Sequence, residues 1–166
     1  LDDGFLEHVF MFAPLHDIGK VGIPDRILLK QGRLDAEEMD VMRTHARMGE
    51  KMIEDLVDSF GLEHFGYRDM LRNIAASHHE AMNGTGYPQG LEGEEIPLEA
   101  RIVAVADVFD ALTSRRPYKE AWSNERAMDA LRALAGESLD PSCVEALLAN
   151  MAEVEDIQRR FREREL

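Results

Sequence analysis

Residues 99–114, EARIVAVADVFDALTS, place apolar side chains on almost every face of a helix. A helix that is apolar all round is normally buried among other elements, whereas a surface helix carries a single apolar stripe. We therefore predict that this segment is the central helix of the fold.

Asp107 is a carboxylate inside this apolar segment. Burying an unpaired carboxylate is costly, so such groups normally have a neutralising partner. The nearest cation of the segment, Arg101, lies on a different helix face, and Asp110 adds a second negative charge one turn later. A bound metal ion would satisfy Asp107. The alternative is that Asp107 and Asp110 cap or hydrogen-bond neighbouring backbone.

Helical periodicity dominates the rest of the chain, and no alternating apolar and polar run is long enough to predict a strand. Pro14 must kink or divide the first helix. Asp35 with Glu38, Ser123, and Asp140 followed by proline each mark a helix start. The predicted helices cover about residues 3–19, 26–30, 36–44, 45–59, 68–82 and 99–114, with others starting near 123 and 140. We predict one all-α domain over residues 1–166.

Three further segments lead to local expectations. Residues 9–15, VFMFAPL, are predicted to form a buried helix rather than a signal peptide, since they lack a basic flank and a cleavage site. Residues 83–98 are too rich in glycine and proline for regular structure, and such a loop beside a metal site is a candidate substrate rim. The amphipathic tail 151–166 is interpreted as a solvated last helix, with pairing to a second copy as the alternative.

The bulk composition excludes several classes of protein. The 166 residues suffice for one domain with a sizeable core, and no apolar run approaches the ~20 residues of a membrane span. The net charge of −14 makes duplex DNA or RNA an unsuitable partner. Cys143 is the single cysteine, which excludes an internal disulfide and is typical of a reducing cytoplasm. The chain begins at Leu1 rather than Met, so we expect a fragment or a processed form.

Histidine and aspartate recur in a pattern that suits a metal ion, because zinc, iron and manganese accept nitrogen and carboxylate ligands. His16 and Asp17 are adjacent, and Lys20 follows one turn later. A lysine beside metal ions also requires an anion, which suits a phosphate. The alternative is a surface salt bridge between Asp17 and Lys20.

The doublet of His78 and His79 is the sharper signal, because it precedes the glycine-rich loop. Either histidine alone would be interpreted as a satisfied core residue, and His45 alone as a helix-end residue. His8 and His64 have no comparable neighbours, and we assign them no role.

Four segments of the chain resemble the motifs of HD-GYP domains, a branch of the HD phosphohydrolase superfamily. They are HDIGKVGIPDRILLKQGRLDAEE (16–38), RTHARMGEKMIEDL (43–56), HHEAMNGTGYPQGLEGEEIP (78–97) and ARIVAVADVFDALTSRRPYKEAW (100–122). Their order and spacing agree with the family over about residues 10–140. Gly86, Tyr87 and Pro88 supply the defining tripeptide.

The resemblance implies an α-helical domain that binds divalent transition metals, iron or manganese with zinc as an alternative, and hydrolyses cyclic di-GMP to pGpG or GMP. Metal-activated hydroxide would attack the phosphodiester, since coordination lowers the pKa of water to about 7. Lys20 and Asp110 would support phosphate binding and proton handling. The implied metal ligands are His16, Asp17, His45, His78, His79 and Asp107, and the implied substrate contacts are Gly86, Tyr87, Pro88, Arg116 and Lys119.

The chain also departs from the family pattern. Two further ligands, a glutamate and a histidine, normally lie well upstream of the HD doublet, and Glu7 and His8 are too close to occupy those positions. We therefore expect two metals and no third. Met82 and Asn83 replace the usual Trp-Asp pair before the motif. We interpret this as a minor adjustment of the loop, because neither residue is a predicted ligand.

Two other functions remain open. One is a catalytically silent module that binds a cyclic dinucleotide or another protein. The other keeps the chemistry but acts on a different cyclic dinucleotide. In the family the loop around Tyr87 also contacts other proteins, including diguanylate cyclase domains, so such a partner is possible here.

Overall fold

The computed structural model describes residues 2–61, 66–115 and 120–162 of the chain. In these ranges every helix or strand assigned is a helix, and the β-structure consists of the isolated bridges Asn83–Glu92 and Ala135–Leu139. The all-α prediction is confirmed. The elements are α1 (Asp3–Phe12), η1 (Ala13–Leu15), η2 (Ile18–Gly22), α2 (Asp25–Leu28), α3 (Ala36–Arg43), α4 (His45–Phe60), α5 (Arg68–Ser77), η3 (Gly93–Glu95), α6 (Leu98–Thr113), α7 (Asn124–Leu134), α8 (Pro141–Ala149) and α9 (Met151–Arg162).

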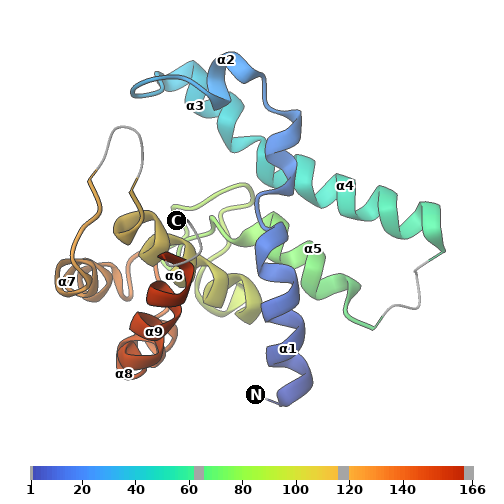
Figure 1. Ribbon diagram of the computed structural model, residues 1–166. Coiled ribbons are helices and arrows are strands. Elements are labelled where there is room, and N and C mark those ends of the chain that lie inside the picture. Colours follow the sequence, from blue (N-terminus) through green and yellow to red (C-terminus); the bar gives the residue numbers. More distant parts are fainter. Residues whose placement is uncertain (1, 62–65, 116–119, 163–166) are drawn as a thin grey trace.

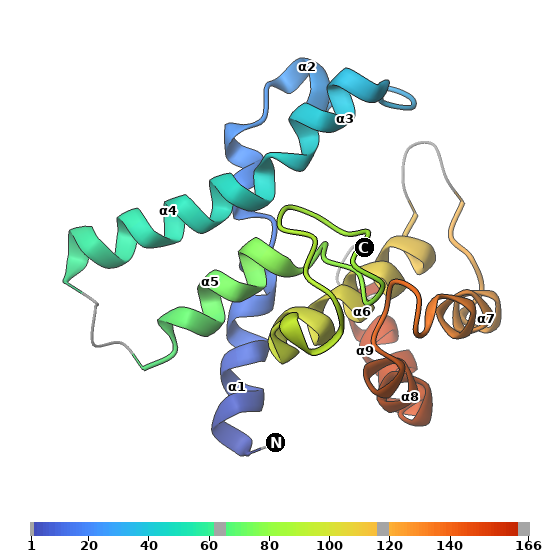
Figure 2. The ribbon, with the colours of Figure 1, turned by 180° about the vertical axis from the view of Figure 1, so that it is seen from behind.

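Helix α6 is the central element, as its composition predicts. It packs against α5 on one side and against α7 and α8 on the other (Figures 1 and 2). Val103 belongs to an apolar cluster with residues of α1 and α5, whereas Ala104, Val105 and Phe109 belong to a second cluster with residues of α7 and α8. The helix is apolar on several faces because it forms part of two cores.

The first helix is shorter than predicted. Helix α1 ends at Phe12, and Pro14 lies in the short 3-10 helix η1. Proline has no N–H to donate and its ring crowds the preceding turn, which explains the division. The chain then turns at His16 and Asp17 before η2 begins, so both residues lie between two helical segments.

The prediction that residues 9–15 form a buried helix is wrong. Val9 and Phe12 are buried, but Phe10 is 83% exposed and Met11 is 53% exposed. Helix α1 therefore carries apolar side chains on two faces: Val9 and Phe12 face the core with α5, whereas Phe10 and Met11 face solvent.

Element η2 packs unusually closely on α4. A Cβ at Gly19 would lie 1.9 Å from the carbonyl oxygen of His45 and 2.5 Å from the backbone nitrogen of Gly49. Only a residue without a side chain permits this approach of backbone to backbone. The contact brings the Asp17 turn against the first residue of α4, which is His45.

Local capping signals are confirmed. Asp35 and Glu38 form a reciprocal capping box at α3, with both N–H···O distances 2.9 Å. The Ser123 hydroxyl accepts a hydrogen bond at the start of α7, and the Asp140 carboxylate accepts two at the start of α8. The predicted helix 68–82 is too long at its end, because α5 stops at Ser77 and residues 78–82 are not helical.

Candidate metal centre

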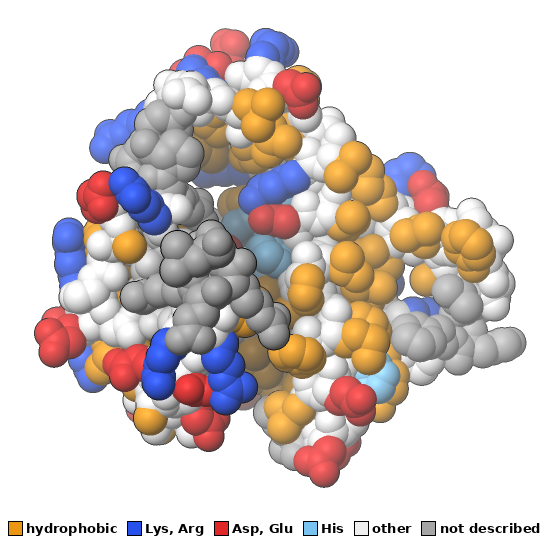
Figure 3. All heavy atoms as spheres, in the orientation of Figure 1, with side chains coloured by type: hydrophobic (Ala, Val, Ile, Leu, Met, Phe, Trp, Pro, Cys, Tyr) orange, Lys and Arg blue, Asp and Glu red, His pale blue; other side chains and the backbone are white. Residues whose placement is uncertain are grey.

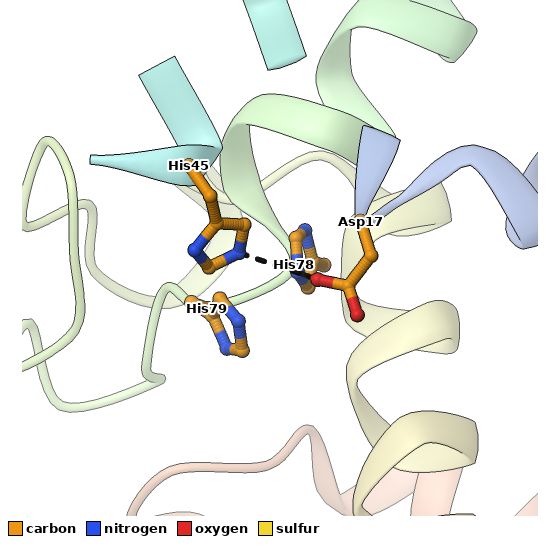
Figure 4. A group of neighbouring side chains, drawn as sticks. All are labelled: Asp17, His45, His78 and His79. Atoms are coloured by element: carbon orange, nitrogen blue, oxygen red, sulfur yellow. Dashed lines mark ion pairs between the residues drawn. The ribbon is translucent and has the colours of Figure 1, made fainter. Parts of the chain in front are cut away.

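Asp17, His45, His78 and His79 converge on one point (Figure 4). One potential ligand atom from each lies within 4.8 Å of those of the other three. All four residues occupy helix ends: Asp17 precedes η2, His45 begins α4, and the other two follow α5. Residues far apart in the sequence therefore meet where these elements abut.

Three atoms of this cluster are buried without a hydrogen-bond partner: Asp17 Oδ1, His45 Nε2 and His78 Nε2. Asp17 Oδ1 lies 3.4 Å from His45 Nε2 and 3.8 Å from His78 Nε2. Leaving a buried polar group unsatisfied costs about 1–3 kcal/mol. Three such atoms facing one point fit a divalent transition metal, which takes mixed nitrogen and oxygen ligands.

Backbone carbonyls orient three of the histidine rings. The Nδ1 atoms lie 2.7 Å from Ala13 O in His16, 2.7 Å from Met42 O in His45, and 2.9 Å from Ile74 O in His78. A carbonyl accepts only, so each Nδ1 carries a proton and donates it. In the neutral rings of His45 and His78 this leaves the Nε2 lone pair without a hydrogen-bond partner, whereas Nε2 of His16 faces the Asp17 carboxylate. Metal-binding histidines are oriented in this way.

His16 lies beside the four-residue cluster, next to the second oxygen of Asp17, and Asp107 lies next to His16. His16 Nε2 is 3.3 Å from Asp17 Oδ2 and 3.8 Å from Asp107 Oδ1. Lys20 also donates to Asp17 Oδ2. The two oxygens of Asp17 thus face two different sets of side chains, a geometry that allows one carboxylate to serve two metal ions.

The sequence did not determine which group neutralises or hydrogen-bonds the Asp107 carboxylate. Arg101 is not its partner, because the Arg101 guanidinium donates to Asp140 at 2.6 Å. Asp107 is half-buried and approaches His16. Asp110 is exposed and accepts a hydrogen bond from the Ser114 hydroxyl at 2.9 Å, so the structure does not place it in the cluster.

The pKa shifts of His78, His79 and Asp17 favour the protonation states that bind metal, whereas the shift of His16 favours its protonated form. Burial lowers the pKa of His78 to about 4, with repulsion from His16 adding to the effect. Burial likewise lowers the pKa of His79 to about 3, with repulsion from His78 second. Burial opposes ionisation of Asp17, but hydrogen bonds from His16 and Lys20 outweigh it and hold the pKa well below its usual value. A hydrogen bond to Asp17 raises the pKa of His16.

The loop that carries Gly86, Tyr87 and Pro88 borders the cluster. A Cβ at Gly86 would lie 2.3 Å from the backbone nitrogen of Ala81, so only glycine fits there. The Tyr87 ring stacks on the His79 ring, with centroids 4.8 Å apart and planes at 25°. The peptide bond from Tyr87 to Pro88 is cis.

Several neighbours of the cluster were not identified from the sequence. The Arg43 guanidinium lies 5.4 Å from the centroid of the Tyr87 ring, and Arg47 donates to the Pro88 carbonyl at 3.2 Å. Glu80 is buried and holds the loop by hydrogen bonds. Their positions in the sequence could have indicated that they lie near the cluster, since both arginines lie two residues from His45 and Glu80 follows His79.

The predicted phosphate contacts Arg116 and Lys119 lie outside the described residues, as does His64. His8 lies on α1, where its ring stacks on that of Tyr67 with centroids 3.4 Å apart, and it is not part of the cluster. In the space-filling view, histidine side chains lie at the bottom of a hollow near the middle of the molecule, with charged side chains beside them (Figure 3). No helix in the described residues is long and apolar enough to cross a membrane.

The chain is similar to known proteins over most of its length. It is 51% identical over 151 residues to the cyclic di-GMP phosphodiesterase response regulator RpfG of Xanthomonas campestris, a match that covers 91% of this chain and 38% of that protein. It is 43% identical over 141 residues to 3'3'-cGAMP-specific phosphodiesterase 2 of Vibrio cholerae, covering 85% of this chain and 26% of that protein. The chain thus spans well under half the length of these curated relatives.

A solved structure has a similar fold. The crystal structure of a cyclic GMP-AMP-specific phosphodiesterase of V. cholerae, V-cGAP3, matches with a TM-score of 0.63 at 22% identity, covering 96% of this chain and 43% of that one. The family model described as "HD domain" matches residues 1–143, which include every residue of the cluster. The chain therefore belongs to the HD-domain family, and its motifs place it in the HD-GYP branch.

Proposed function

We propose that this chain is the catalytic domain of a metal-dependent phosphodiesterase that hydrolyses cyclic di-GMP to pGpG, GMP or both. The observation that carries the proposal is the trio of buried, unpartnered ligand atoms on Asp17, His45 and His78. The similarity to cyclic-dinucleotide phosphodiesterases adds the substrate class.

The site would bind two divalent metals, iron or manganese with zinc as an alternative, one at each carboxylate oxygen of Asp17. His45, His78 and His79 would hold one ion with Oδ1 of Asp17. His16 and Asp107 would hold the other with Oδ2. Bound metals of this kind activate water and neutralise charge on a phosphodiester.

Lys20 and Asp110 would assist the reaction. Lys20 already lies against Asp17, so its ammonium group can bind a non-bridging phosphate oxygen at the edge of the site. Asp110 lies one turn beyond Asp107 on α6 and is exposed, so it can accept the proton released when water attacks. Formation of pGpG breaks one P–O3′ bond, and the leaving oxygen takes up a proton.

Tyr87 and the residues around it would bind the nucleotide. Burial raises the pKa of the Tyr87 hydroxyl to about 12, so it keeps its proton at neutral pH and can donate a hydrogen bond. Gly86 and Pro88 set the position of this ring, and Arg116 and Lys119 would contact the phosphates or a guanine. These cations would add local positive charge for an anionic ligand in a chain whose net charge is −14.

The test is hydrolysis of cyclic di-GMP by the anaerobically purified chain with Fe²⁺ or Mn²⁺, followed by chromatography of the products. We expect Asp17→Ala and His78→Ala to lose both bound metal and turnover. Asp55→Ala is the matched control, because among the described residues this exposed carboxylate pairs with Lys51 alone, on the surface of α4. Turnover by the metal-free variants at the wild-type rate would contradict the proposal.

The same assay separates the other two functions. Binding of cyclic di-GMP without product, with both metals bound, would favour the silent binding module. Assaying hydrolysis of a panel of cyclic dinucleotides that includes 3'3'-cGAMP tests whether the substrate is a different one, since one relative is named for 3'3'-cGAMP. Binding of a diguanylate cyclase-type protein through the loop around Tyr87 stays a prediction.

A further inference from the structure

His79 is restrained differently from the other histidines of the metal centre. His16, His45 and His78 each have Nδ1 against a backbone carbonyl, whereas no described residue hydrogen-bonds the His79 ring. Its ring contacts are with His45, His78 and Tyr87. Tyr87 is the member of this set that is not itself a proposed ligand, and its plane is the closest to parallel, at 25°. The Tyr87 ring therefore limits how the His79 imidazole can rotate.

The position of Tyr87 depends in turn on a buried carboxylate. Glu80 is 4% exposed, and its Oε1 accepts a hydrogen bond from the Gln89 N–H at 2.7 Å. Its Oε2 accepts from the N–H groups of Gly90 and Leu91, both at 3.0 Å. Three successive N–H groups thus close around one anion. The peptide that follows Tyr87 and Pro88 is held to the residue that follows His79.

Two other contacts support the same loop. The Tyr87 N–H donates to the His79 carbonyl at 3.2 Å, and Arg47 donates to the Pro88 carbonyl at 3.2 Å. Neither contact engages residues 89–91. Glu80 is therefore the described side chain that fixes this part of the loop, and both of its oxygens are already engaged away from the metal cluster.

We propose that Glu80 is a positioning residue of the metal centre, which holds the loop so that Tyr87 fixes the His79 ring for metal binding. This role rests on the proposed function, because it needs a metal at Asp17, His45, His78 and His79. A carboxylate suits it better than an amide does, since all three partners are donors. A glutamine would turn an NH₂ group toward at least one of those N–H groups.

The experiment measures Mn²⁺ affinity by competition with a chromophoric chelator, together with the melting temperature of each metal-free protein. We expect Glu80→Gln and Tyr87→Ala to weaken Mn²⁺ binding by roughly 10–100-fold, the usual effect of removing support behind a ligand. Tyr87→Phe keeps the stacked ring and should bind like the wild type. The double variant with both Glu80→Gln and Tyr87→Ala should be no weaker than Tyr87→Ala, because the two residues act through one contact.

Asp140→Asn is the matched control for lost stability. Asp140, which precedes α8, is also a buried carboxylate that accepts hydrogen bonds from two backbone N–H groups. Its side chain pairs with Arg101 of α6, and among the described residues it has no hydrogen bond to the loop around Tyr87. We expect this variant to melt at a lower temperature and to bind Mn²⁺ normally. A loss of affinity in Asp140→Asn equal to that in Glu80→Gln would assign the effect to stability and overturn the positioning role.

The outcomes separate this inference from the function on which it rests. Wild-type protein that binds no Mn²⁺ overturns the proposed function, and this role with it. Wild-type protein that binds Mn²⁺ with the same affinity as Glu80→Gln overturns the positioning role alone. If Glu80→Gln does not fold, the Mn²⁺ affinities of Tyr87→Ala and Tyr87→Phe are compared instead. Equal affinities of those two variants would refute the role.

Discussion

Gly19→Ala should disrupt the metal centre without altering any proposed ligand. The added Cβ would lie 1.9 Å from the His45 carbonyl oxygen, whereas ordinary contacts of this kind begin near 3.4 Å. Both groups belong to backbone, so no side chain can rotate away. Element η2 and α4 must therefore separate by about 1.5 Å, and overpacking of this kind costs about 1–3 kcal/mol.

The same displacement moves Asp17, two residues earlier, away from His45, which begins α4. Their ligand atoms are now 3.4 Å apart, so a separation of this size is large relative to the site. We expect the melting temperature of the metal-free protein to fall by roughly 2–12 °C, since 1 kcal/mol corresponds to about 2–4 °C for a domain of this size. We also expect Mn²⁺ affinity to fall.

The assays are thermal unfolding by circular dichroism and the chelator competition. Gly66→Ala is the control, because a Cβ there meets no atom of the described residues within 4 Å and its φ is not in the left-handed range. It should be neutral or stabilising by up to about 1 kcal/mol. A Gly19→Ala protein with the wild-type melting temperature and Mn²⁺ affinity would refute the argument from backbone contact.

Two further predictions concern stability. In the metal-free protein, His78 and His79 have folded-state pKa values of about 4 and about 3, below the ordinary value of 6.5. The unfolded chain therefore binds more protons than the folded one below pH 6.5, so stability falls as pH decreases from 6.5 toward about 4. Urea unfolding should show this slope in the wild type and a shallower slope in His79→Asn; equal slopes would contradict the assignment. Arg101→Met leaves the buried carboxylate of Asp140 without its guanidinium partner, and we expect a loss of about 3 kcal/mol of unfolding free energy. Mn²⁺ affinity should not change, and a loss comparable to that in Asp17→Ala would show that the Arg101 pair supports the site after all.

Interactions within a few residues of the chain were predictable. The capping box of Asp35 and Glu38, the Ser123 cap and the Asp140-Pro141 start depend on atoms three residues apart or fewer, so sequence spacing is enough to identify them. The central place of α6 followed from an apolar composition that no surface helix can carry. Ligand candidates were also found, because histidine and aspartate occurred in motifs specific to one family.

Long-range packing was not predictable in the same way. Phe10 and Phe12 have the same side chain, yet one is exposed and the other buried, because only one faces α5. The sequence indicated that Arg101 lies on a different helix face from Asp107, but it did not indicate that the partner of Arg101 is Asp140, 39 residues away. No periodicity in the chain encodes which of two acidic residues a cation will meet.

The sequence by itself determined the helical class, the caps and the ligand types, since each rests on local spacing or residue chemistry. The tertiary structure alone decided how those candidate ligands are arranged. It placed the two oxygens of Asp17 toward different side chains, left the Nε2 atoms of His45 and His78 buried without partners, and put Tyr87 over His79 through the loop held by Glu80. The physical reason is that ligand geometry depends on how helix ends abut, and that is set by contacts such as Gly19 on His45, between residues distant in the chain.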